Sequence, residues 1–223
     1  MNTKTDTKTD VKPVLQMTED GLALSAGGQT VRGDFMKMLP RLRQANLQEE
    51  MLLRAARIRN ADHPLRALDA TAGLGEDALI LAAGGFQVDL YENDPVIAAL
   101  LRDALQRASE EEALKDIAAR MTLHEADSIE AMKTLAPVYD VIYLDPMFPA
   151  REKSALVKKK FQLLHELEKP CRDEEALLAA AMALRPLKLV VKRPLKGAYL
   201  AGRKPDYSLK GKAIRYDCFV FAR

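Results

Sequence analysis

Short apolar runs alternate with helix-like runs between residues 65 and 145, and this alternation is the feature that most constrains the fold. The apolar runs have the length and composition of buried strands and cover residues 65–69, 87–92, 121–125 and 139–145. The helix-like runs lie between them, at residues 77–83, 95–108 and 128–135. Parallel strands need helical crossovers of this kind. The alternation therefore predicts an α/β domain with a mostly parallel sheet and right-handed connections.

The remaining segments extend this core at both ends. After residue 145 we expect helices at residues 153–167 and 174–184, a strand at 187–192, and a final antiparallel hairpin from 207–209 and 214–221. Before the core we expect a hairpin from residues 22–24 and 29–31 and a helix at 47–59. The predicted organisation is a disordered tail at residues 1–12, an N-terminal appendage at 13–64 and the main domain at 65–223.

A turn of small residues follows the first core strand and resembles a nucleoside-binding turn. It runs from Asp69 to Gly75, and Gly73 and Gly75 would let the backbone approach a ligand closely. Asp77 begins the next helix, and Glu92 ends the second strand, where a carboxylate can hold ribose hydroxyls. NAD-binding domains pair similar features, but the full Gly-x-Gly-x-x-Gly pattern is missing here. As alternatives to ligand binding, Asp69 and Asp77 could be helix-capping acids.

The strand at residues 139–145 ends in Asp145-Pro146-Met147-Phe148-Pro149, which brings an acid, a rigid turn and an aromatic ring together. Ligands bind at the carboxyl ends of strands in open α/β sheets. Asp145 and the Pro146 carbonyl could accept hydrogen bonds from an amino group while Phe148 stacks on a flat base. This arrangement suits methylation of an exocyclic base nitrogen and favours S-adenosylmethionine (SAM) as cofactor. Alternatively, Phe148 could be a core aromatic residue.

Composition excludes several other classes of protein. The chain has 223 residues, 48% of them hydrophobic, and no apolar run approaches the roughly 20 residues of a membrane span. The first 12 residues lack the apolar centre of a signal peptide. Two cysteines, Cys171 and Cys218, and three dispersed histidines give neither a disulfide framework nor metal-ligand spacing. We expect a cytoplasmic protein that uses no metal.

Charge is divided unevenly along the chain. Residues 1–150 carry 16 basic and 24 acidic side chains, whereas residues 151–223 carry 18 basic and 8 acidic side chains. Such asymmetry indicates a polyanion at one side of the molecule. We therefore expect RNA backbone contacts from basic residues near the predicted active edge. The candidates are Lys158, Lys159, Lys160, Lys192 and Arg193, although any single lysine could equally belong to a solvated surface.

Taken in order, these motifs resemble the RsmJ-type small-subunit (16S) rRNA guanine-N2 methyltransferases. The resemblance spans residues 65–195 and rests on segments 69–75, 92–96, 144–149, 153–159 and 190–194. It implies a class I SAM-dependent methyltransferase: a Rossmann-like, mostly parallel seven-stranded sheet with a C-terminal antiparallel hairpin. It also implies SAM as methyl donor and 16S rRNA, or the small ribosomal subunit, as partner.

By motif position, the resemblance implies a set of cofactor contacts along the sheet edge: Glu76, Asp77, Glu92, Asn93, Asp127, Ser128 and Asp145. Three of these depart from the family pattern. Some relatives have a basic residue at the positions of Glu76 and Asn93, and serine is common at the position of Asp127. Asp127 could accept a hydrogen bond from the adenine amino group. Ser128 could instead be only the N-cap of the following helix.

Two other functions compete with methylation of guanine N2. An acid followed by proline and an aromatic residue would also serve methylation of adenine N6 or of another RNA or DNA base. A more distant alternative is a non-catalytic RNA-binding assembly factor that retains the fold. Asp145 together with Gly73 and Gly75 favours an enzyme over this last function.

Overall fold

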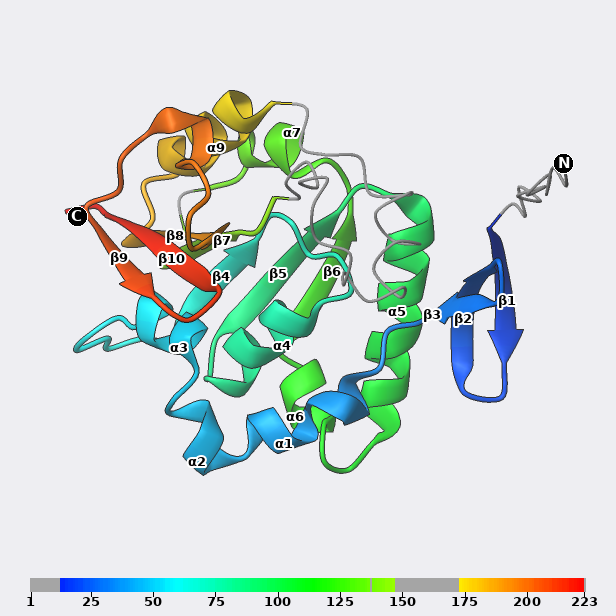
Figure 1. Cartoon of the computed structure of the whole chain (residues 1–223). Helices are drawn as coiled ribbons and strands as arrows, with labels where there is room; N and C mark the ends of the chain where they lie inside the picture. Colours follow the sequence, from blue (N-terminus) through cyan, green and yellow to red (C-terminus); the bar gives the residue numbers. More distant parts are fainter. Residues whose placement is uncertain (1–12, 137, 147–172, 223) are drawn as a thin grey trace, which may run out of the picture.

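The computed structural model describes residues 13–136, 138–146 and 173–222. Within these residues, seven strands form one sheet in the order β6-β5-β4-β7-β8-β10-β9 (Figure 1). The strands are β4 (Arg66–Asp69), β5 (Gln87–Glu92), β6 (Met121–Glu125), β7 (Val141–Leu144), β8 (Lys188–Pro194), β9 (Tyr207–Lys210) and β10 (Ile214–Val220). The first five pair in parallel, and β10 is antiparallel to both β8 and β9. The predicted α/β sheet with its C-terminal antiparallel hairpin is therefore confirmed.

Helices cover both faces of the sheet. The crossover helices are α4 (Glu76–Ala83), α5 (Pro95–Glu110), α6 (Lys115–Ala118), α7 (Ser128–Met132) and α9 (Glu174–Ala183). Alternate residues of the central strands enter two separate cores. Tyr143 and Val190 pack on the side of α4, whereas Ile142 and Leu189 pack on the side of α7 and α9. Burial on both faces explains why these strands read as continuous apolar runs in the sequence.

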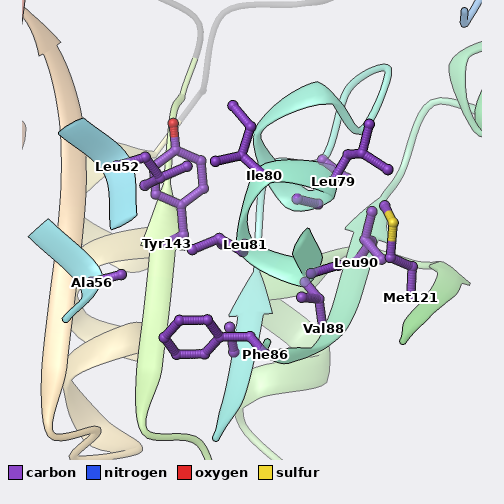
Figure 2. Packing of buried hydrophobic residues seen from close by; sticks show 14 of the residues in the cluster. Leu52, Ala56, Leu79, Ile80, Leu81, Phe86, Val88, Leu90, Met121 and Tyr143 are labelled. Carbon is purple, nitrogen blue, oxygen red and sulfur yellow. The ribbon is translucent and has the colours of Figure 1, made fainter. Parts of the chain in front are cut away.

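The segment before the sheet contributes to the main core. It contains a short 3-10 helix (Phe35–Met38) and helices α1 (Leu39–Leu42), α2 (Gln44–Leu47) and α3 (Met51–Ala56). Phe35 and Leu52 from this segment are almost fully buried in the core on the α4 side. Figure 2 shows side chains from α3, α4 and the sheet meeting around Tyr143. The N-terminal segment thus completes the cover over this face of the sheet.

The predicted helix at residues 47–59 is shorter than expected. Helical structure is interrupted after α2 and resumes only at Met51, because Glu50 takes an extended conformation with ψ of 118°. The Glu50 carboxylate instead accepts two hydrogen bonds from Arg41, at 2.8 and 2.9 Å. This pairing between residues nine positions apart was not visible from helical periodicity.

The predicted N-terminal hairpin is present and gains a third strand. Strands β1 (Val14–Thr18), β2 (Gly21–Ala26) and β3 (Gln29–Val31) form a small antiparallel sheet. Leu24 and Val31 pack against Ile97 and Leu100 of α5, so this sheet lies beside that helix (Figure 1). The predicted tail at residues 1–12 and the predicted helix at 153–167 lie outside the described residues.

Candidate active site

The candidate site lies where the sheet changes direction along the chain. From β4, the order runs through β5 to β6 on one side and through β7 to β8 on the other. The carboxyl ends of β4 and β7 therefore lie at the topological switch point, the place where open α/β sheets bind ligands. The turn after Asp69 and the segment starting at Asp145 meet at this point. The Asp145 backbone N–H donates to Thr71 Oγ1 at 2.7 Å.

The glycine turn has the backbone that its sequence predicts. Gly73 and Gly75 have φ values of 53° and 76°, in the left-handed region that favours glycine. At Gly75 a Cβ atom would lie 2.6 Å from Leu101 Cδ1, so a larger residue would have to displace the α5 side chain. The turn is therefore packed tightly against the fold and leads directly into α4.

Glu92 at the end of β5 holds the glycine turn and the start of α5 together. One carboxylate oxygen accepts from Gly73 N and the other from Asp94 N, each at 2.9 Å. Burial raises the pKa of Glu92, while these backbone hydrogen bonds oppose the rise. Asp94 in turn caps α5 by accepting from Val96 N and Ile97 N. Glu92 thus links the glycine turn to the end of β5, the position from which a carboxylate can reach ribose hydroxyls.

Asp69 lies beneath the turn. It is 1% exposed and accepts from Thr71 N at 3.0 Å and from Thr71 Oγ1 at 3.4 Å. Burial raises the pKa of Asp69 to about 8. Because Thr71 also accepts from the Asp145 backbone, Asp69 supports the contact between the cofactor turn and the end of β7.

Lys192 is the central cation of the site. Its Nζ lies 2.7 Å from Asp77 Oδ2 and 2.8 Å from Asp145 Oδ2, and the Tyr143 hydroxyl donates to the same Asp77 oxygen at 2.6 Å. Burial alone would lower the pKa of Lys192, but the two carboxylates raise it well above its ordinary value. Burial also raises the pKa of Asp145, and the Lys192 charge opposes that rise. Lys192 therefore favours the ionised form of Asp145.

The two basic residues predicted to bind RNA at the end of β8 have different surroundings. Lys192 faces the carboxylates of the site, whereas Arg193 is 4% exposed and points to the other side of the sheet. The Arg193 guanidinium donates to Glu174 at 3.2 Å and to the Ala198 carbonyl at 2.8 Å, which fixes the loop after β8. Sequence reasoning missed the Lys192 pairing. The sequence did place Lys192 near the end of a predicted strand, and the parallel pairing of that strand with β7 brings Lys192 beside Asp145.

The other predicted contacts lie further along the same edge. Asp127, rather than Ser128, is the N-cap of α7 and accepts from Ile129 N at 2.8 Å. Ser128 is nearly buried, whereas Asn93 and Glu76 are exposed. Pro146, which follows Asp145, is buried. Phe148 and the lysines at positions 158, 159 and 160 lie outside the described residues.

Neither a metal centre nor a membrane segment is found in the part of the chain that the structure describes. No group of three histidine, cysteine or acidic side chains there comes close enough to hold a metal ion. Among the described helices, none combines the length and hydrophobicity needed to cross a bilayer.

Comparisons with known proteins agree with this geometry. Residues 2–221 match the family model described as "Putative SAM-dependent methyltransferase". A protein of Marinobacter nauticus named ribosomal RNA small subunit methyltransferase J is 44% identical over 92% of this chain and 77% of its own length. The protein of the same name from Pseudomonas syringae pv. tomato is 43% identical over 94% of this chain and 80% of its own length.

Two solved structures show the same architecture. A SAM-dependent methyltransferase from Neisseria gonorrhoeae superposes with a TM-score of 0.75 at 32% identity, covering 95% of this chain and 84% of that chain. An rRNA methyltransferase from Streptomyces viridochromogenes superposes with a TM-score of 0.51 at 16% identity, covering 79% of this chain and 84% of that chain, and it shows the fold alone.

The residues at the sheet edge fit SAM as the cofactor of this fold. The left-handed turn at Gly73 and Gly75 allows a close backbone approach, and Glu92 ends β5, where a carboxylate can hold ribose hydroxyls. The comparisons agree with the strand order at this edge, and the chain belongs to the family of class I SAM-dependent methyltransferases that includes the proteins named ribosomal RNA small subunit methyltransferase J.

Proposed function

We propose that this methyltransferase modifies the exocyclic N2 of a guanine in 16S rRNA of the small ribosomal subunit. The names of the relatives support small-subunit rRNA as the substrate. The observation that carries the choice of an exocyclic amine is the position of Asp145 at the end of β7. Lys192 holds one carboxylate oxygen of Asp145, and Thr71 holds its backbone N–H.

Bound SAM supplies an activated methyl group on a sulfonium. The protein therefore contributes mainly alignment, which supplies about 7–11 kcal/mol when the reacting groups are well oriented. Guanine N2 is a weak nucleophile because its lone pair is delocalised into the ring. Asp145 and the Pro146 carbonyl accept its two N–H bonds and favour a pyramidal nitrogen. The Asp145 carboxylate keeps this acceptor role only while it is ionised, and Lys192 stabilises that state.

The contacts with RNA extend beyond Asp145 in this proposal. Phe148 stacks on the extruded base, since enzymes that act on a base remove it from its stack. Lys158, Lys159 and Lys160 contact phosphates, as the excess of 18 basic over 8 acidic side chains in residues 151–223 favours. Lys192 acts near the target base by holding Asp145, whereas Arg193 acts indirectly by fixing the loop after β8. Glu92 and Asp127 contact the nucleoside of the cofactor, and Glu76, Asp77, Asn93 and Ser128 line the same edge.

The experiment that tests the function measures methyl transfer to defined nucleic acids. The purified protein is incubated with SAM and small-subunit rRNA from cells that lack it, and the product is mapped by mass spectrometry. We expect one N2-methylguanine, with no transfer to tRNA or DNA. Methylation of adenine N6 would instead support the alternative amine, and the absence of any transfer would support an assembly factor.

Asp145→Asn is the variant matched to this test. Asparagine keeps the shape of the side chain but loses the charge that pairs with Lys192, so methyl transfer should fall by at least about tenfold to a hundredfold. The melting temperature and the chromatographic profile check that the variant folds. Near-native turnover by a folded Asp145→Asn variant would rule out the proposed role of this carboxylate.

A further inference from the structure

A groove of about 320 Å³ opens between the start of α3 and the start of β10. Its volume lies at the lower end of the range for ligand sites in proteins, about 300–1,000 Å³. The groove mixes charged, polar and apolar side chains, and the lining residues are Arg41, Asn46, Glu49, Glu50, Met51, Ile214 and Tyr216. None of these was assigned a role from the sequence.

Tyr216 gives the groove a polar group that lacks a partner among the described residues. The residue is only 4% exposed, yet its hydroxyl makes no hydrogen bond to any group in the described part of the chain. The oxygen is not sealed off, because it is absent from the fully buried atoms that lack partners. Buried tyrosine hydroxyls usually find a hydrogen-bond partner. An accessible hydroxyl with no partner among the described residues can therefore bond a ligand atom in the groove.

The groove adjoins the catalytic edge. Tyr216 on β10 is the cross-strand neighbour of Lys192 on β8, the residue that pairs with Asp145. Directly opposite residues in an antiparallel pair have Cβ atoms about 4.5–5.5 Å apart and lie on the same face of the sheet. The charges of Asp77 and Asp145 act on the Tyr216 hydroxyl, and with burial they raise its pKa. A ligand in the groove would thus be a neighbour of the reacting base.

The lining chemistry favours a base over a phosphate. The Arg41 guanidinium is already paired with both Glu50 oxygens, and Glu49 adds a further acid, so the described lining residues leave no unpaired positive charge for a phosphate. Carboxylate, amide and hydroxyl groups can instead bond the donors and acceptors on the edge of a base. Met51 and Ile214 provide apolar contact for the face of its ring.

We propose that this groove binds a nucleobase of the RNA substrate that flanks the methylated guanine, with the Tyr216 hydroxyl bonded to the base edge. The inference rests on the proposed function and extends it to the choice of sequence around the target. Tyr216 is a specificity residue in this proposal, because it touches the substrate away from the reacting atoms.

The test compares the full-length protein with Tyr216→Phe. The change removes only a hydroxyl that bonds nothing within the described residues, so the fold should be retained. Loss of one hydrogen bond to RNA should raise the Kd and the KM for small-subunit rRNA by about threefold to tenfold. The Kd for SAM and the kcat at saturating RNA should stay within error. Tyr207→Phe is the matched control, since Tyr207 lies on the neighbouring strand and does not line the groove.

A second measurement identifies the bound base. Short RNAs that span the target are made with one flanking base at a time replaced by an abasic site. One abasic position should weaken binding to the wild type more than it weakens binding to Tyr216→Phe, because the variant has already lost the hydrogen bond to that base.

Each other outcome has a defined meaning. An unchanged Kd for RNA in Tyr216→Phe overturns the inference, and equal weakening of SAM binding would assign the groove to the cofactor and also overturn it. If the wild type methylates rRNA and Tyr216→Phe binds RNA with an unchanged Kd, the inference about the groove is refuted and the proposed function stands. The proposed function fails separately, if the wild type methylates no small-subunit rRNA.

Discussion

Replacing Lys192 with methionine tests whether this lysine sets the ionisation of Asp145. Methionine is an apolar side chain of similar length, so the change removes the charge and little volume. Asp77 and Asp145 would then lose the cation that lies 2.7 and 2.8 Å from their oxygens. An opposite charge at such a distance lowers the pKa of a carboxyl by about 1–3 units. Its removal should therefore raise the pKa of Asp145 by a similar amount.

The same change has a cost in stability. Removing one partner of a buried ion pair costs about 3–5 kcal/mol. The Lys192, Asp77 and Asp145 side chains are 23%, 20% and 32% exposed, so solvent screening reduces the expected cost to about 2–3 kcal/mol. At about 2–4 °C per kcal/mol for a chain of this size, the melting temperature should fall by about 4–12 °C at neutral pH. The loss should shrink as the pH falls through the raised pKa of Asp145, because protonation relieves the repulsion.

The assay is a pH–rate profile of single-turnover methylation with saturating SAM and rRNA. The acid limb of Lys192→Met should lie about 1–3 pH units above that of the wild type, because Asp145 must be ionised to accept the amine. Lys133→Met is the matched control. It breaks a pair with Glu130 at 2.6 Å whose side chains are both more than half exposed, and such pairs contribute at most about 1 kcal/mol. Coincident acid limbs for the wild type and Lys192→Met would refute the reasoning.

Two further changes test the cofactor side of the site. Glu92→Ala should raise the Kd for SAM, measured by calorimetry, by at least about tenfold, because a charged acceptor is lost, while the Kd for RNA stays constant. Glu125→Ala, at the paired position on β6, is the control. Equal increases of the Kd for SAM in both variants would exclude a special role for Glu92. Asp69→Asn should flatten the pH dependence of stability. Since the folded pKa of Asp69 is about 8, the wild type should lose stability as the pH rises from about 4 to about 8, whereas asparagine cannot ionise. Parallel urea-denaturation midpoints for both proteins across that pH range would show that Asp69 is ionised in the fold.

The central strands were predictable because burial on both faces leaves a direct trace in the sequence. Residues 65–69 and 87–92 were expected as strands, and β4 and β5 occupy nearly the same positions. The break before α3 was not predictable, because it depends on Glu50 pairing with Arg41 rather than on local helix preference. Periodicity describes the neighbours of a residue along the chain, whereas this contact depends on the fold.

The acids of the site were predictable for a similar reason. Asp145 and Glu92 stand at strand ends, and parallel strands present those ends at one edge. The partners of these acids were not predictable. Lys192 meets Asp77, 115 residues earlier in the chain, and sequence alone placed that lysine among phosphate contacts. Tyr216 lies near the site only because β10 runs antiparallel beside β8, a pairing that no local sequence pattern indicates.

The hydrogen bond from the Asp145 backbone to Thr71 joins the two halves of the reaction site mechanically. In the proposed reaction, Thr71 belongs to the turn that would meet the methyl donor, and Asp145 would meet the acceptor. Any shift of that turn on donor binding would reach the Asp145 segment through this one hydroxyl. Such coupling is reciprocal by thermodynamic necessity, so the affinity for one substrate changes with the other by the same factor in both directions. In the proposed reaction, the Thr71 hydroxyl is thus one route by which the donor and the RNA would change each other's affinity.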